Sequence, residues 1–123
     1  MLVAIAIPVF TTQLERSRET TDMANIRSAY AAGTTAALTG YIGTAEIGDT
    51  TTEKSFFYDP SVNGSLVSSG GVSLGQGTAT DGKADTSALP GGCTYKTTDN
   101  VKGKVIEVKI KDGAVTSVNF STT

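Results

Sequence analysis

Few side chains in this sequence could do acid–base or nucleophilic chemistry. The chain has no histidine, the residue that most often titrates near neutral pH and most often binds metals. Serine–histidine and cysteine–histidine nucleophile pairs are therefore excluded. Two carboxylate pairs remain, Glu15 with Glu19 and Asp81 with Asp85, and these have the residue types of a general acid and base. Both pairs lie in very polar stretches, so we interpret them as solvated surface charge and predict neither an enzyme nor a cofactor.

The stretch from Asp81 to Asp85, DGKAD, is a weak candidate for a calcium loop. It lacks the closely spaced oxygen ligands of such a loop, and a simple turn is the better interpretation. Cys93 is the single cysteine, which excludes an intramolecular disulfide. It is either a small buried apolar residue or a free thiol, and the buried state is the commoner one. We therefore predict no metal site.

The composition favours an exported protein. The chain has 123 residues, the length of one domain. Its apolar fraction of 38% is low for a globular domain, and serine and threonine make up the difference. The net charge of −2 lacks the basic excess of a nucleic-acid-binding protein, so we expect no nucleic-acid partner.

One long helix is predicted near the start of the chain. From Val9 to about Leu38 there is no proline, and Gly33 is the single internal glycine. Apolar side chains spaced three and four apart predict the face that packs on a sheet. These residues are Met23, Ile26, Tyr30 and Ala37.

The start of this helix pattern has a different character. Thr11 to Asp22 alternates in charge, and the pairs Glu15–Arg18, Arg16–Glu19 and Arg18–Asp22 would each support an exposed helix by about 0.2–0.5 kcal/mol. We expect this zone to be solvated nearly all round. Before it, Met1 to Ile7 is apolar throughout. Such a segment is suited to lipid or to other helices, or to a tail buried in the domain's own core, and the charged spacer argues against the tail.

The run from Leu2 to Phe10, LVAIAIPVF, together with the polar and amphipathic continuation to Ala32, resembles the later part of the N-terminal helix of type IV pilins and pseudopilins. In that family an apolar run ends in this proline and a polar helical stretch follows. The family's initial phenylalanine, glutamate and basic leader are absent here. The resemblance therefore implies about fourteen further apolar residues ahead of Met1, which would give a bilayer-spanning length of about 20. Without them we expect neither membrane insertion nor a normal filament.

The resemblance also implies a role, a set of partners and a location. It implies a filament on the cell surface, built from copies of this chain, with subunits held in the inner or cytoplasmic membrane and handled by pilus assembly machinery before assembly. The residues that it places in the filament core are those of the apolar helix end: Leu2, Val3, Ile5, Ile7, Pro8, Val9, Phe10 and Leu14.

The second half of the chain predicts strands. Residues 104–111 alternate, with Ile106, Val108 and Ile110 on one face, and Asp112-Gly113 leads into a second alternating run, which is a strong hairpin signal. Further strands are expected at 54–58, at 66–67 or 72–74, and at 93–96. The predicted fold is α+β, a long N-terminal helix packed on a small antiparallel sheet. We predict one pilin-like domain, with the helix in 1–40, variable loops in 41–92 and C-terminal strands in 93–123.

Three functions remain open from the sequence. The first is the structural subunit of an extracellular type IV pilus, and the second is a pseudopilin of a type II secretion system. The third is a stand-alone secreted surface-binding module. Lys102, Lys104, Lys109 and Lys111 form a small basic cluster, which we interpret as a solvated strand face. The absence of a convincing calcium loop favours the pilus over the pseudopilin.

Overall fold

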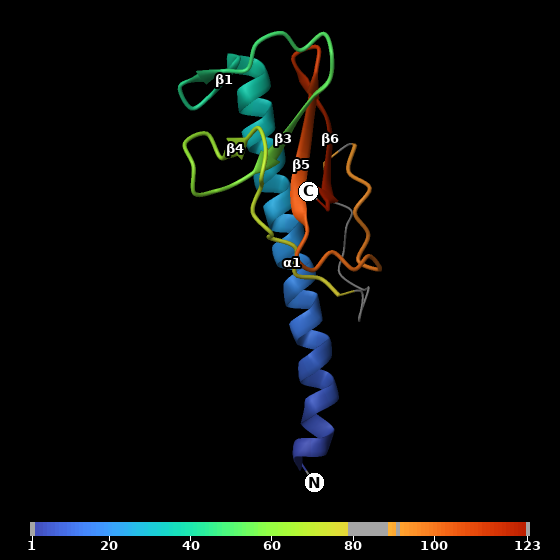
Figure 1. Ribbon diagram of the computed structural model, residues 1–123. Helices are drawn as coiled ribbons and strands as arrows, with labels where there is room; N and C mark the ends of the chain where they lie inside the picture. The colour runs from blue at the N-terminus through green and yellow to red at the C-terminus, as the bar shows by residue number, and fades with distance from the viewer. Residues whose placement is uncertain (1, 79–88, 91, 123) are drawn as a thin grey trace.

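The structure, a computed structural model, describes residues 2–78, 89–90 and 92–122, and the side chains from Leu14 onward. One long helix, α1 (Leu2–Thr39), lies along one face of an antiparallel sheet and extends beyond it at the N-terminal end (Figure 1). Two short strands, β1 (Tyr41–Ile42) and β2 (Ala45–Glu46), follow the helix and pair with each other. The predicted α+β class is confirmed.

The larger sheet has four antiparallel strands in the order β4-β3-β5-β6. Their bounds are β3 (Lys54–Tyr58), β4 (Leu66–Val67), β5 (Val105–Lys111) and β6 (Ala114–Ser121). In register, Phe56 of β3 lies opposite Val108 of β5, which in turn lies opposite Val118 of β6. Two of the four strands therefore come from the region that the sequence predicts to be mainly variable loops.

The β5–β6 hairpin forms as the sequence predicts. Asp112 and Gly113 have φ angles of 53° and 73°, and two positive angles in succession define the type I′ turn that suits a two-residue hairpin. Ile106, Val108 and Ile110 are fully buried on the face that the alternation assigns to the core. The hairpin is thus the part of the sheet for which local sequence and final structure agree most closely.

The helix α1 begins at Leu2, which agrees with the helix predicted in 1–40, and it passes through Pro8. Pro8 therefore lies inside the helix and not in its first turn, so the backbone hydrogen bond that its missing N–H would donate is absent there. At the other end Gly40 has a φ of +78° and its N–H donates to the Ala36 carbonyl at 2.8 Å. A glycine in this conformation ends many helices.

The helix packs on the sheet through small residues. Ala29, Gly33 and Ala36 are buried on the same face as Ile26. The closest approach is at Gly33, where a Cβ atom would lie 2.6 Å from Val108 Cγ1 and 3.0 Å from Val115 Cγ2. A larger residue at this position would push the helix away from β5 and β6.

This close packing corrects part of the predicted helix face. Met23 and Ile26 lie in the core, and Ala37 is partly buried at its margin. Tyr30, however, is 37% exposed, and Ala29 takes the buried position beside it. The reason is that α1 lies too near the sheet for an aromatic ring, so the face that turns inward is the one that carries alanine and glycine.

One predicted strand, at 93–96, does not form, and the choice between two alternative strands is resolved. Residues 72–74 lie outside the strands, and of the two alternatives 66–67 is the strand. Residues 93–96 have no partner ladder, because a side chain of β6 takes its place. Thr94 N–H donates to Asn119 Oδ1 at 2.6 Å, and Asn119 Nδ2 donates to the Gly92 carbonyl at 3.2 Å. The Asn119 amide group thus does for this segment what a neighbouring backbone would do in a sheet.

Candidate functional site on the helix

The acidic residues in the middle of α1 are buried, and the prediction that they are solvated is wrong. Glu15, Glu19 and Asp22 are each 0% exposed. They are spaced by four and three residues, and the next step of four leads to Ile26. Residues with this spacing share one side of a helix. One continuous face of α1 therefore changes from acidic to apolar along its length.

Segment 75–78 lies across the acidic part of this face and supplies hydrogen-bond donors. Gln76 N–H donates to Asp22 Oδ1 at 2.9 Å, and Gly77 N–H donates to Asp22 Oδ2 at 2.7 Å. Thr78 donates to the two carboxylate oxygens of Glu15, through its N–H and through Oγ1, both at 2.9 Å. The two carboxylates thus bind a loop that follows them by more than fifty residues and hold it on the helix.

The same segment is held from its other side by residues 100–104. Gly75 N–H donates to the Lys104 carbonyl at 3.0 Å, and Val101 N–H donates to the Gly77 carbonyl at 2.9 Å. A Cβ atom at Gly75 would clash with the Val101 carbonyl oxygen, and one at Gly77 would lie 2.9 Å from Asp22 Oδ2. Glycine is therefore needed at both positions, so this glycine pair fits a tight structural contact and not a flexible loop.

The local electrostatics disfavour ionised groups. Burial raises the pKa of Asp22, although the amides of Gln76 and Gly77 oppose this shift. The hydroxyl of Tyr95 is buried and has no hydrogen-bond partner among the residues that the structure describes. Burial raises the pKa of the Tyr95 phenol well above its usual range, and the negative charges of Asp22 and Glu19 raise it further. Arg18 forms an ion pair with one of these carboxylates, with its Nη1 3.6 Å from Glu15 Oε1. This is one of the three predicted helix pairs.

We expect Tyr95→Phe to be at least as stable as the unchanged protein at pH 7, with a gain of about 1 kcal/mol. An unsatisfied buried hydroxyl costs about 1–3 kcal/mol, and phenylalanine keeps the ring that packs on Phe120 at a centroid distance of 5.6 Å. Urea unfolding of the two proteins measures the difference. A loss above about 1 kcal/mol would mean that the hydroxyl has a partner and would contradict this account.

Alkaline pH should increase the difference in unfolding free energy between Tyr95→Phe and the unchanged protein. The folded-state pKa of Tyr95 is raised, so its contribution to stability is complete below the unfolded value of about 10 and is lost as the pH rises above it. Tyr95→Phe lacks this loss, and its advantage should grow between pH 9 and pH 11. Tyr41→Phe is the matched control, because Tyr41 is 48% exposed. It should leave the alkaline unfolding curve unchanged.

The geometry defines an anchoring site for the 75–78 loop. The three carboxylates are closed off from solvent, and the oxygens of Asp22 and Glu15 bind amides and a hydroxyl of the chain itself. Within the described ranges, no group of three acidic or sulfur side chains is arranged as metal ligands would be. The weak calcium candidates Asp81 and Asp85 lie outside the described residues. Cys93 packs at the margin of the core, and burial raises the pKa of its thiol.

The acidic face also marks where the body of the molecule ends along α1. N-terminal to it the helix continues past the end of the sheet (Figure 1). This part carries the predicted assembly residues Leu2, Val3, Ile5, Ile7, Pro8, Val9 and Phe10, for which the backbone is described and the side chains are not. Leu14 is 41% exposed, at the border. Among the described residues, no helix has both the length and the apolar character needed to cross a bilayer.

Comparison with known proteins identifies no relative of this chain. No protein-family model, no curated protein and no solved structure matches the chain. The functional interpretation therefore depends on the fold, on the anchoring site and on the sequence of the helix.

Proposed function

We propose that this protein is a structural subunit of an extracellular filament of the type IV pilus kind, assembled through the apolar N-terminal end of α1. The observation that carries the proposal is the division of one helix into two parts. The part from Glu15 onward is bound to the loop and the sheet, and the part before it extends away from both (Figure 1).

The energetics of the two parts support this division of roles. The body is held to the helix by contacts from Glu15 onward, and the described core cluster takes its helix residues from Met23 to Ala36. Burying one large aliphatic side chain is worth about 1.5–3 kcal/mol. The run from Leu2 to Ile7 contains four such residues, so packing it against copies of itself, or against lipid before assembly, would provide a strong driving force.

The body has the features of a headgroup that would coat such a filament. The four-stranded sheet covers one side of α1, and the acidic anchors tie the 75–78 loop to the same helix. A headgroup fixed in this way moves with its helix as one unit. This is what a filament needs if its core is made of helices and its outer surface of sheets.

The test is recovery of the protein in filaments sheared from cells that produce it from its complete gene. Ile5→Asp should lower the amount in the sheared fraction at least tenfold, because a carboxylate in an apolar helix core is strongly disfavoured. Ser69→Asp adds the same charge at an exposed position of the body and should assemble normally. Electron microscopy with antibody labelling identifies the filaments.

Two outcomes would overturn the proposal. One is unchanged filament assembly of Ile5→Asp, which would exclude the apolar helix end as the assembly element. The other is recovery of the unchanged protein as free monomer in the medium, which would favour a stand-alone secreted module. Confinement to short filaments within the cell envelope would instead favour the pseudopilin, the alternative with the same architecture.

A further inference from the structure

The four-stranded sheet has two edges, and the edge at β4 is short. This strand has only two residues, Leu66 and Val67, and it is the first strand in the order of the sheet. The β1–β2 hairpin packs on the turn that precedes β4, since a Cβ atom on Gly43 would lie 2.7 Å from Asn63 Nδ2. A very short edge strand gives another chain little backbone with which to pair.

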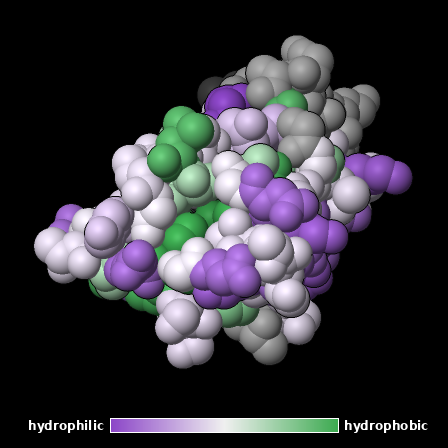
Figure 2. Space-filling model, turned by 90° about the horizontal axis from the view of Figure 1, so that it is seen from above, coloured by the Kyte–Doolittle hydropathy of each residue, from purple (hydrophilic) through white to green (hydrophobic). Residues whose placement is uncertain are grey.

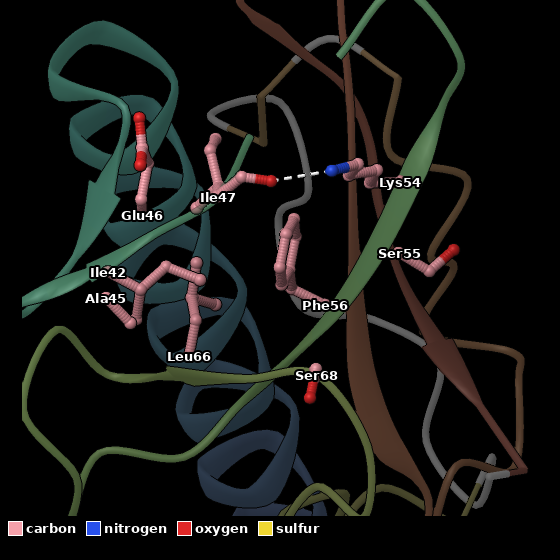
Figure 3. A pocket seen from close by; sticks show the side chains of 9 residues that line it. All are labelled: Ile42, Ala45, Glu46, Ile47, Lys54, Ser55, Phe56, Leu66 and Ser68. Atoms are coloured by element: carbon pink, nitrogen blue, oxygen red, sulfur yellow. Dashed lines mark hydrogen bonds between the residues drawn. The ribbon is translucent and has the colours of Figure 1, made fainter. Parts of the chain in front are cut away.

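The side chains at the β4 edge are fixed by the core. A hollow of about 510 Å³ lies between the hairpin and strands β3 and β4. Viewed from this end of the molecule, apolar side chains form the floor of a hollow between polar ones (Figure 2). Figure 3 shows Phe56 and Leu66 grouped with Ile42 and Ile47. Phe56, Leu66 and Ile47 belong to the core cluster, so the β4 edge is both short and firmly held.

The opposite edge, β6, has the features of a strand that could pair with another chain. It has eight residues, and among the described residues no strand pairs with its outer side. From Gly113 to Thr123 the sequence contains no charged residue and no proline. Charged side chains and proline are common means by which natural proteins keep an edge strand from pairing with another copy. We therefore looked for a different form of protection on β6.

A bulge protects the first half of β6. Val115 and Ser117 lie opposite consecutive residues of β5, so Thr116 is an extra residue without a partner on that strand. A bulge bends an edge strand and interrupts regular pairing along it. Residues 117–121 follow the bulge and keep a regular register with β5, so this second half of β6 needs protection of another kind.

Segment 92–94 covers the second half of β6, and one side chain holds it there. Asn119 Oδ1 accepts hydrogen bonds from the N–H and the Oγ1 of Thr94, at 2.6 Å and 3.0 Å. Asn119 Nδ2 donates to the Gly92 carbonyl at 3.2 Å. A Cβ atom on Gly92 would clash with the Thr116 carbonyl oxygen, so the segment lies directly on the backbone of β6. The chain after residue 91 runs beside this strand (Figure 1).

The hold on segment 92–94 depends on Asn119, whereas the residues that follow are held by the core. Tyr95 and Thr97 are buried, and the Tyr95 ring packs on Phe120 at a centroid distance of 5.6 Å. Within the described part of the chain, no ladder of backbone hydrogen bonds joins 92–94 to β6. Removal of the Asn119 amide group would therefore release the segment and leave the rest of this region in place.

We propose that Asn119 is an edge-capping residue, which holds segment 92–94 over β6 and so prevents this strand from pairing with β6 of a second copy of the chain. Two identical edge strands can pair antiparallel about a two-fold axis. Pairing centred on position 119 would place the two copies of this residue opposite each other, and β6 itself carries no charge that would oppose it. The inference does not depend on the proposed filament, because this edge belongs to the body and not to the apolar helix start.

Two substitutions of Asn119 test the proposal, because both lose the same three hydrogen bonds but leave different edges. Asn119→Ala uncovers a neutral edge. Its self-association constant, measured by sedimentation velocity, should be at least tenfold higher than that of the unchanged protein. Asn119→Lys places like charges opposite each other in the paired edges, so it should associate no more than the unchanged protein. The comparison separates edge pairing from loss of stability.

Hydrogen exchange locates the contact. In Asn119→Ala the amides of β6 should exchange more slowly as the protein concentration rises, whereas those from Ile5 to Phe10 should exchange as in the unchanged protein. Asn100→Ala is the control, because Asn100 Oδ1 accepts from Lys102 N–H at 3.2 Å within its own exposed loop. It should leave the association unchanged.

Three results would each overturn the inference. The first is an Asn119→Ala protein that associates no more than the unchanged protein. The second is equal association of Asn119→Ala and Asn119→Lys, or of Asn119→Ala and Asn100→Ala, which would attribute the effect to general loss of stability. The third is association of Asn119→Ala without added protection of the β6 amides.

Discussion

Asp22→Ala should lower the free energy of unfolding by about 2–4 kcal/mol, because it leaves the amides of Gln76 and Gly77 without acceptors. Each unsatisfied buried donor costs about 1–3 kcal/mol. The loop from 75 to 78 should also lose protection against proteolysis, since Asp22 provides two of the bonds that hold it on the helix. Urea unfolding followed by circular dichroism measures the loss of stability.

Asp49→Ala is the matched control for Asp22→Ala. Asp49 also accepts a backbone hydrogen bond, from Thr51 N–H at 2.9 Å, but this residue is exposed. Water can replace an exposed acceptor, so the control should lose less than about 1 kcal/mol. Equal losses in the two variants would show that burial of the acidic face contributes nothing to the strength of the anchor.

The protonation state of Asp22 gives this prediction a pH dependence with a definite sign. Burial raises the folded-state pKa of Asp22 above its usual 3.8, so the folded protein retains that proton more readily than the unfolded chain does. The contribution of Asp22 to stability is thus complete below about pH 4 and is lost as the pH rises through the folded-state pKa. The stability of the unchanged protein relative to Asp22→Asn should therefore increase as the pH falls from 7 towards 4. A difference that decreases over this range would contradict the sign of the shift.

Gly33→Leu should destabilise the protein by about 3 kcal/mol, at the upper end of the usual cost of overpacking a core. Its side chain would have to occupy the space where a Cβ atom alone lies 2.6 Å from Val108 Cγ1. Val108 is fully buried at the centre of the sheet and is β-branched, so it has little freedom to turn aside. The measurement is again the free energy of unfolding in urea.

Ala31→Leu places the same side chain on the exposed side of the helix and should cost less than about 0.5 kcal/mol. A second check is Gly33→Ala combined with Val108→Ala. If the contact limits the approach of helix to sheet, the double variant should be more stable than the sum of the single losses predicts. Additive losses would mean that Gly33 is needed for a reason other than its contact with Val108.

Much of the fold could be predicted from the sequence because its signals are local. The Asp112-Gly113 turn, the alternation through Ile106, Val108 and Ile110, and the strand at 54–58 all depend on neighbouring residues, and all are found in the structure. The strand expected at 93–96 was wrong for the opposite reason. Whether that segment joins a sheet depends on Asn119, which lies on β6 and takes the place of a neighbouring strand.

The anchoring site was mispredicted although a signal for it exists. Positions 15, 19, 22, 26, 29, 33 and 36 follow a strict spacing of four and three residues, and all seven are buried. Three of these positions hold carboxylates, so a search for apolar residues at helical spacing does not detect the whole face. Their burial becomes favourable only through amides that the 75–78 loop supplies from a distant part of the sequence. The sheet contact expected at Tyr30 is made by Ala29 for a different reason, which is the close approach of α1 to the sheet.

Amide hydrogen exchange along α1 measures most directly whether the helix divides at Glu15 into a part that holds the body and a part left for assembly. In the monomeric protein, amides from Ile26 to Ala36 should exchange as slowly as those of β5, through global unfolding. Amides from Ile5 to Phe10 should exchange at least a hundredfold faster, because the sheet does not extend over that part of the helix (Figure 1). Equal protection of the two stretches in the monomer would show that the apolar segment packs within its own domain, and would contradict the proposed role of the helix.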